Sequence, residues 1–148
     1  MSSTSRRLFL LIAVLALLGI AVSSVSLDQH YRKSKTTYCD FGQTFNCDIV
    51  NRSEYSNVAG VPVALIGILG YAALLAFATL YRRKAETPGI LVVASLAGLA
   101  FALYLTYVEK FMLAVWCILC LTSLAIIFTI TVLSVCLFLL SMQPASRA

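Results

Sequence analysis

Four of the five cysteines form two pairs whose spacing suits thiol–disulfide chemistry. Cys117 and Cys120 lie three residues apart in an apolar segment, so on a helix both thiols share one face and are close enough to form a disulfide. In the first turns of that helix, its free N–H groups and positive dipole end favour a thiolate. Cys39 and Cys47 lie in a polar segment, where a short disulfide ring closes easily in an oxidising compartment. Together the pairs predict a relay, with one disulfide in a mobile, exposed loop and one dithiol facing the lipid.

Other interpretations of these residues stay open. The four cysteines together are a possible zinc site, although the Cys39–Cys47 spacing is wider than zinc sites usually have. A pair of core cysteines in an apolar helix is the alternative for Cys117 and Cys120. Cys136 is expected to be a small buried hydrophobe, and the only histidine, His30, a solvated loop residue. We therefore expect no metal.

The composition indicates which kind of fold must position these cysteines. Of the 148 residues, 61% are apolar and 11% charged, against about 45–50% and about 25% in soluble domains. This excludes a disordered chain, a nucleic-acid-binding domain and a disulfide-rich secreted miniprotein, and favours a single membrane domain over residues 1–148. No segment indicates a strand. The prediction is an all-α bundle of four transmembrane helices, at about 8–27, 61–81, 89–108 and 115–142, with a long outer loop at 28–60.

Charge asymmetry predicts the orientation of the bundle in the cell (inner) membrane. With four spans both termini lie on one side, and that side carries six basic residues against the single acid Glu86. The positive-inside rule makes this side cytoplasmic and places both cysteine pairs on the extracytoplasmic side. The first segment exceeds the usual length of a signal peptide's apolar region, so we expect it to be retained. The basic residues are Arg6, Arg7, Arg82, Arg83, Lys84 and Arg147.

Small residues in the second and third predicted spans indicate close helix contact. Gly67 and Gly70 lie in one span, and Ala94, Gly98 and Ala102 recur every four residues in the next. Such residues let helix backbones approach each other in lipid, so we expect them to pack helix against helix.

Four motifs occur in an order that resembles the vitamin K epoxide reductase family. They are Cys39-Asp40-x-Gly42 with Cys47, Asn51-x-Ser53, Gly60-Val61-Pro62 followed by Gly67, Gly70 and Tyr71, and Trp116-Cys117-x-x-Cys120. The resemblance covers nearly the whole chain and is to the prokaryotic form. It implies a four-helix bundle around a quinone near the outer face. Since no fused thioredoxin-like domain follows, it also implies a separate thioredoxin-fold partner.

The resemblance also implies a role for each cysteine and for one hydroxyl. Cys39 would form the mixed disulfide with the partner, and Cys47 would pass electrons to Cys117. Cys120 would be the thiolate beside the quinone ring. Ser53 occupies the family's serine or threonine position, where a hydroxyl can hydrogen-bond within the site; the N-cap of a short helix is its alternative.

The expected quinone contacts differ from those of the animal enzymes. Val63 and Leu124 stand where those enzymes have an asparagine and a tyrosine, so we expect plain quinone reduction rather than epoxide reduction. Trp116 and Tyr104 are candidates to pack against the ring, with a place in the interfacial aromatic belt as the alternative. The predicted activity transfers electrons from a periplasmic DsbA-like protein to ubiquinone, menaquinone or a vitamin K-type quinone. The alternatives are a vitamin K-type quinone or epoxide reductase and a non-enzymatic cysteine–metal membrane scaffold.

Overall fold

The computed structural model describes residues 2–32 and 39–143. The fold is mostly helical, as predicted. Arg147, which contributes to the expected charge asymmetry, lies outside the described residues.

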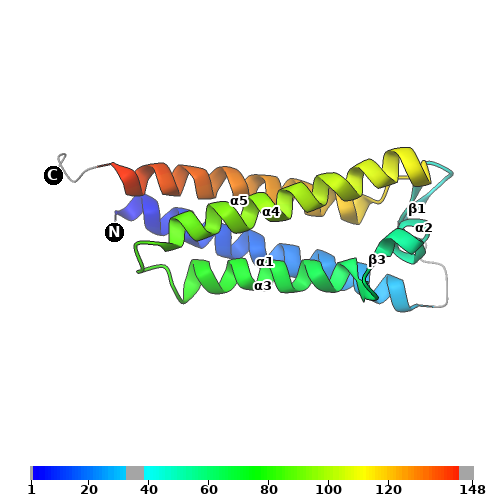
Figure 1. Ribbon diagram of the computed structural model, residues 1–148, viewed down its shortest axis with the longest axis horizontal. Coiled ribbons are helices and arrows are strands. Elements are labelled where there is room, and N and C mark those ends of the chain that lie inside the picture. The colour runs from blue at the N-terminus through cyan, green and yellow to red at the C-terminus, as the bar shows by residue number, and fades with distance from the viewer. Residues whose placement is uncertain (1, 33–38, 144–148) are drawn as a thin grey trace.

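Four long helices lie side by side (Figure 1). They are α1 (Ser3–Tyr31), α3 (Val63–Thr79), α4 (Thr87–Val108) and α5 (Ile118–Met142). Helix α1 packs mainly on α3 and α5, and α4 packs mainly on α5. Among the described residues, three helical segments are long and apolar enough to cross a membrane: α1, α5 and Thr87–Leu113, which extends α4. Helix α3 is also apolar but has 17 residues.

The helix ends differ from the predicted spans for local reasons. Helix α1 begins where the Ser2 hydroxyl accepts the N–H of Ser5 at 3.2 Å, and it continues through the segment expected to be loop to Tyr31. Helix α4 carries Pro88 in its first turn, where a missing N–H costs little. It then continues as one π-helical turn, η2 (Glu109–Leu113), and the chain reverses at Ala114, which has a positive φ of 52°.

Short elements fill the segment between α1 and α3. They are β1 (Asp40–Phe41), β2 (Phe45–Asn46), α2 (Cys47–Arg52), the 3₁₀ turn η1 (Glu54–Ser56), β3 (Asn57–Val58) and β4 (Val61–Pro62). The strands form two antiparallel hairpins, so the prediction that no segment is a strand is wrong. Strands of two residues are too short to show the alternation that marks a strand in sequence.

The chain ends and the cysteine-bearing segment lie at opposite ends of the helices. Figure 1 shows both termini and the α3–α4 connection at one end, with β1, α2 and β3 at the other. Between these ends the buried core is apolar, and it includes Ile12, Leu74, Leu91, Ile130 and Leu137. Large apolar side chains also cover the outward faces of the helices, as expected where lipid is the solvent.

The small residues do more than pack helices together. A Cβ at Gly67 would lie 2.8 Å from the Ser23 hydroxyl oxygen, and one at Gly98 would lie 3.2 Å from Ile127, so both positions allow close contact as predicted. At Gly70 the prediction is wrong, because no atom lies within 4 Å of an added Cβ. Gly70 instead borders an internal cavity.

Candidate active site

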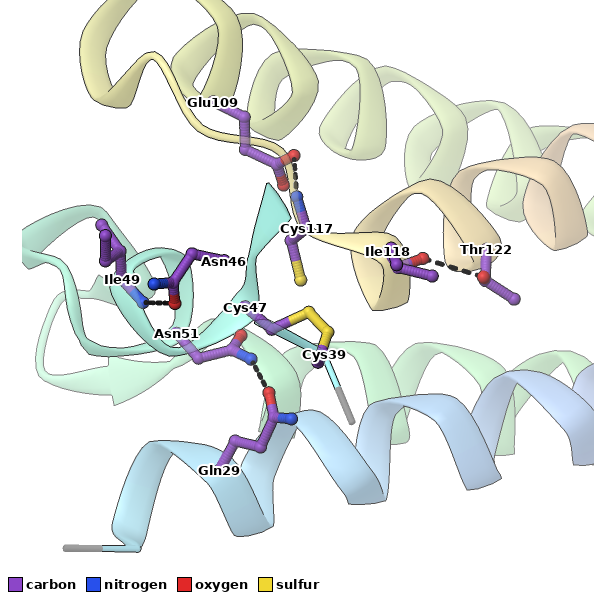
Figure 2. Close-up of a disulfide and its surroundings, with 10 residues drawn as sticks. All are labelled: Gln29, Cys39, Asn46, Cys47, Ile49, Asn51, Glu109, Cys117, Ile118 and Thr122. Carbon is purple, nitrogen blue, oxygen red and sulfur yellow. Dashed lines mark hydrogen bonds between the residues drawn. A yellow bond between two sulfur atoms is a disulfide. The ribbon is translucent and has the colours of Figure 1, made fainter. Parts of the chain in front are cut away.

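Backbone hydrogen bonds dock β2 against the residues that precede α5. The N–H of Trp116 donates to the carbonyl of Thr44 at 2.8 Å, and the N–H of Asn46 donates to the carbonyl of Trp116 at 3.0 Å. Phe45 and Trp116 thus form a parallel bridge. Since Cys47 follows Asn46 and Cys117 follows Trp116, this register brings the two cysteine pairs together. Figure 2 shows the Cys117 sulfur pointing towards the Cys39–Cys47 disulfide.

The Cys39–Cys47 disulfide closes the first hairpin and is buried. Its Cα atoms are 5.6 Å apart. Cys39, Cys47 and Cys117 are only 3%, 1% and 0% exposed, in a small cluster with Val50 and Val115. The prediction of an exposed loop disulfide is therefore wrong. The hairpin is held in place because α2 and the chain before α5 both pack against it.

Cys117 and Cys120 are free thiols with different surroundings. Helix α5 begins at Ile118, so Cys117 is the N-cap residue and has an extended backbone. The prediction that Cys117 lies in the first turn of the helix is therefore wrong. Cys120 lies within the first turn, is partly buried and borders the internal cavity. The pair therefore connects the disulfide cluster with the cavity.

The cavity has a volume of about 390 Å³ and is lined mainly by α1, α3, α4 and α5. Small residues such as Gly70, Ala97 and Gly98 leave this space, and most of the wall is apolar. Polar side chains at its outer edge come from the end of α1 and from the α2–η1 segment, and include His30 and Asn51. This volume and lining are typical of pockets for small organic molecules.

The predicted quinone contacts divide into two groups. Cys120 and Val63 border the cavity, whereas Trp116, Tyr104 and Leu124 are not among its lining residues. Tyr104 is 53% exposed on the outside of α4, and Trp116 is engaged with β2 through its backbone. Next to Leu124, the cavity is bordered by Ser123, whose backbone carbonyl accepts the Tyr71 hydroxyl at 2.9 Å.

Ser53 also borders the cavity, and its hydroxyl donates to the carbonyl of Val50 at 2.8 Å. Ser53 is the N-cap residue of η1, but its side chain makes no capping hydrogen bond there. Its hydroxyl thus secures the end of α2, which Cys47 begins.

Two expectations about other residues are wrong. His30 lies in the last turn of α1, partly buried, and its Nδ1 donates to the carbonyl of Asn51 at 2.6 Å. The neighbouring Gln29 is fully buried, and its side-chain carbonyl accepts the Asn51 amide at 2.7 Å. These bonds tie α2 to α1. Cys136 is exposed on the surface of α5 rather than buried.

Glu109 is a site residue that the sequence analysis missed. Its side chain is 1% exposed and borders the cavity. Figure 2 shows its carboxylate above Cys117, where Oε2 accepts the N–H of Cys117 at 3.1 Å. Within the described part of the chain, Oε1 has no hydrogen-bond partner. Its place beside Lys110 in the sequence gives no sign of this burial, which follows from the π-helical turn that directs it inwards.

No group of three or more histidine, cysteine, aspartate or glutamate side chains in the described ranges is arranged to hold a metal ion.

The fold and the site define a helical membrane protein with a disulfide, a nearby dithiol and an apolar cavity at one end. The family model described as the vitamin K epoxide reductase family matches residues 10–135, and the chain belongs to this family. Its members are oxidoreductases that act with quinones.

Proposed function

We propose that the protein passes electrons from a separate extracytoplasmic thioredoxin-fold (DsbA-like) protein to a membrane quinone and so drives disulfide formation. The observation that carries this proposal is the docking of β2 on Trp116. It holds Cys117 against the Cys39–Cys47 disulfide, while Cys120 faces the cavity. A sulfur path thus leads from the polar end of the molecule to an apolar pocket.

The proposed arrangement is a four-span bundle in the cell (inner) membrane with cytoplasmic termini. Helix α3 is about 26 Å long at about 1.5 Å per residue, close to the roughly 30 Å hydrocarbon core. The basic residues Arg6 and Arg7 and the Arg82–Lys84 turn lie at the end opposite the two cysteine pairs, which supports this orientation.

The first proposed step is exchange with the partner. A partner thiolate attacks Cys39, forming a mixed disulfide and releasing Cys47 as a thiolate. The partner's second thiolate then attacks its own sulfur in that bond and releases Cys39, so that the partner leaves oxidised and the loop pair reduced. Because Cys39 is 3% exposed, the β1–β2 hairpin must open before the partner reaches it.

The second step transfers the electron pair within the chain. Cys47 attacks Cys117 of an oxidised Cys117–Cys120 disulfide and releases Cys120. Cys39 then attacks Cys47, restoring the loop disulfide and releasing Cys117. The structure contains the products of this exchange, a loop disulfide and two free thiols.

The third step reduces the quinone substrate. The apolar wall and the volume of about 390 Å³ suit a quinone ring, and Cys120 places sulfur at the wall. Overall, two thiols and one quinone become one disulfide and one quinol, with two electrons and two protons transferred. Val63 contributes no polar group to the pocket, which supports quinone rather than epoxide as the substrate.

The test is anaerobic quinone reduction by the purified protein with a reduced DsbA-like donor. Wild type should reduce quinone, and alanine variants of Cys39, Cys47, Cys117 and Cys120 should not. Cys136→Ala is the matched control, because this cysteine is exposed and remote from the others in sequence. The proposal fails if a folded wild-type protein reduces no quinone. It also fails if all four variants retain wild-type rates, as a non-enzymatic scaffold would require.

A further inference from the structure

Glu109 is a buried carboxylate that the sulfur relay, as described so far, does not use. A carboxylate that is 1% exposed in apolar surroundings is costly unless its oxygens are bonded or it serves a reaction. One oxygen accepts the Cys117 N–H, and the other has no hydrogen-bond partner among residues 2–32 and 39–143. This arrangement leaves one acceptor available at the site.

The position of Glu109 relates its carboxylate to the reacting sulfurs. The carboxylate is bonded to the Cys117 N–H, and Cys120 follows three residues later in the first turn of α5. Both Glu109 and Cys120 border the cavity. The carboxylate of Glu109 and the thiol of Cys120 therefore both lie at the wall of the proposed quinone pocket.

We propose that Glu109 carries the protons from the Cys117–Cys120 dithiol to the quinone substrate. This inference rests on the proposed function. Glu109 takes the proton of Cys120, leaving a thiolate that supplies electrons, and then donates that proton to one quinone oxygen. The Cys117 proton follows by the same route as the disulfide closes. Two thiols and one quinone thus yield one disulfide and one quinol, and Glu109 ends as it began.

The other titratable groups bordering the cavity are less suited to this role. They are His30 from α1, Tyr55 from η1 and Tyr71 from α3, besides Cys120 from α5. The Nδ1 of His30 is bonded to Asn51, and the Tyr71 hydroxyl is bonded to Ser123. Lys110, beside Glu109, lies 5.3 Å from the Phe111 ring centre. Among the described residues that border the cavity, Glu109 is the only carboxylate.

The chemistry of Glu109 separates two roles that one variant can test. Oε2 positions Cys117 by accepting its N–H, and a glutamine retains an acceptor there. A glutamine cannot take up a proton. Glu109→Gln therefore keeps the positioning bond and removes the proposed proton transfer.

The experiment is a single turnover in which the pre-reduced protein is mixed anaerobically with a short-tailed quinone. Glu109→Gln should slow quinone reduction by roughly 100-fold at neutral pH, within the range of general acid–base catalysis, with the quinone concentration for half-maximal rate unchanged. The deficit should shrink as the pH rises and bulk hydroxide ionises the thiol. A purely structural role would give the same deficit at every pH. Glu86→Gln, at an exposed position at the opposite end, is the matched control and should match wild type.

The following outcomes decide the proposal. If Glu109→Gln reduces quinone within twofold of wild type, or faster because a repelling charge is gone, Glu109 carries no proton. A deficit that does not change with pH also overturns the proposal. If Glu109→Gln does not fold, Glu109→Met serves instead, because its side chain is of similar length and cannot take up a proton, and a wild-type rate and pH profile in that variant oppose the inference. If wild type itself fails to reduce quinone, it is the proposed function that fails.

Discussion

The bond between Asn51 and Gln29 should control how readily the buried disulfide opens. It joins α2, which begins at Cys47, to the end of α1, and both side chains are buried. Asn51→Leu removes the donor and leaves the Gln29 oxygen without it. Removing one partner of a buried hydrogen bond in this way costs about 1–3 kcal/mol of stability. The substitution weakens the attachment of α2 but leaves the helical core unchanged. The lost stability should therefore make local opening of the Cys39–Cys47 segment easier by the same amount.

The expected magnitude follows from the opening equilibrium. A reductant reaches a disulfide this buried only after local opening, so its rate follows the population of the open state. A cost of about 1.4 kcal/mol raises that population about tenfold. Asn51→Leu should therefore be reduced about tenfold faster than wild type, within limits of roughly fivefold and 150-fold for the full range of costs.

The assay is reduction by a small phosphine in detergent, followed by alkylation of new thiols and mass measurement. Asn57→Leu makes the same chemical change at an exposed position of β3 and should stay close to wild type. The double variant Gln29→Met/Asn51→Leu should be reduced more slowly than Asn51→Leu, because the Gln29 oxygen that lost its Asn51 donor is then removed as well. If folded Asn51→Leu is reduced at the wild-type rate, the α1–α2 bond does not control access to the disulfide.

Further predictions concern the relay and the cavity. Cys120→Ala should abolish the thiolate–quinone charge-transfer absorbance; an unchanged absorbance spectrum on adding quinone would show that another group contacts the ring. When Cys47→Ala is mixed with the oxidised partner, the Cys39 thiolate should attack the partner's disulfide and form a mixed disulfide, visible on a non-reducing gel, and a missing adduct would reverse the order of the loop cysteines. Gly70→Leu should fold, since no atom lies within 4 Å of an added Cβ, but should raise the KM for quinone at least tenfold by filling the cavity; an unchanged KM would place the quinone elsewhere. Cys136→Ser should retain the wild-type rate, and a loss would give this exposed cysteine an unsuspected role.

The sequence predicted the features that depend on local pattern. Runs of apolar residues gave the helices, because a helix needs only a continuous apolar segment and suitable ends. The helix ends were placed less well, since α1 extends beyond Leu27 to Tyr31 where its last turn is held by α2. The pairing of Cys39 with Cys47 followed from their closeness in sequence and is present in the structure.

The features that sequence reasoning missed depend on contacts between distant segments. The burial of the loop disulfide follows from the pairing of β2 with Trp116, some seventy residues further along the chain, and no local pattern encodes this pairing. His30 is held by Asn51 for the same reason. The inward direction of Glu109 depends on a single π-helical turn, which shifts a side chain around the helix relative to an α-helix. A glutamate next to an apolar run was the only available signal.

The start of α5 explains how one short motif can serve two environments. If both cysteines lay inside an α-helix, their side chains would share a face and meet the same neighbours. Here Cys117 precedes the helix in extended conformation and joins the disulfide cluster, whereas Cys120 lies in the first turn and borders the cavity. The hydrogen bonds of Trp116 to Thr44 and Asn46 fix the chain just before this point, so they set where the helix begins as well as where the loop docks.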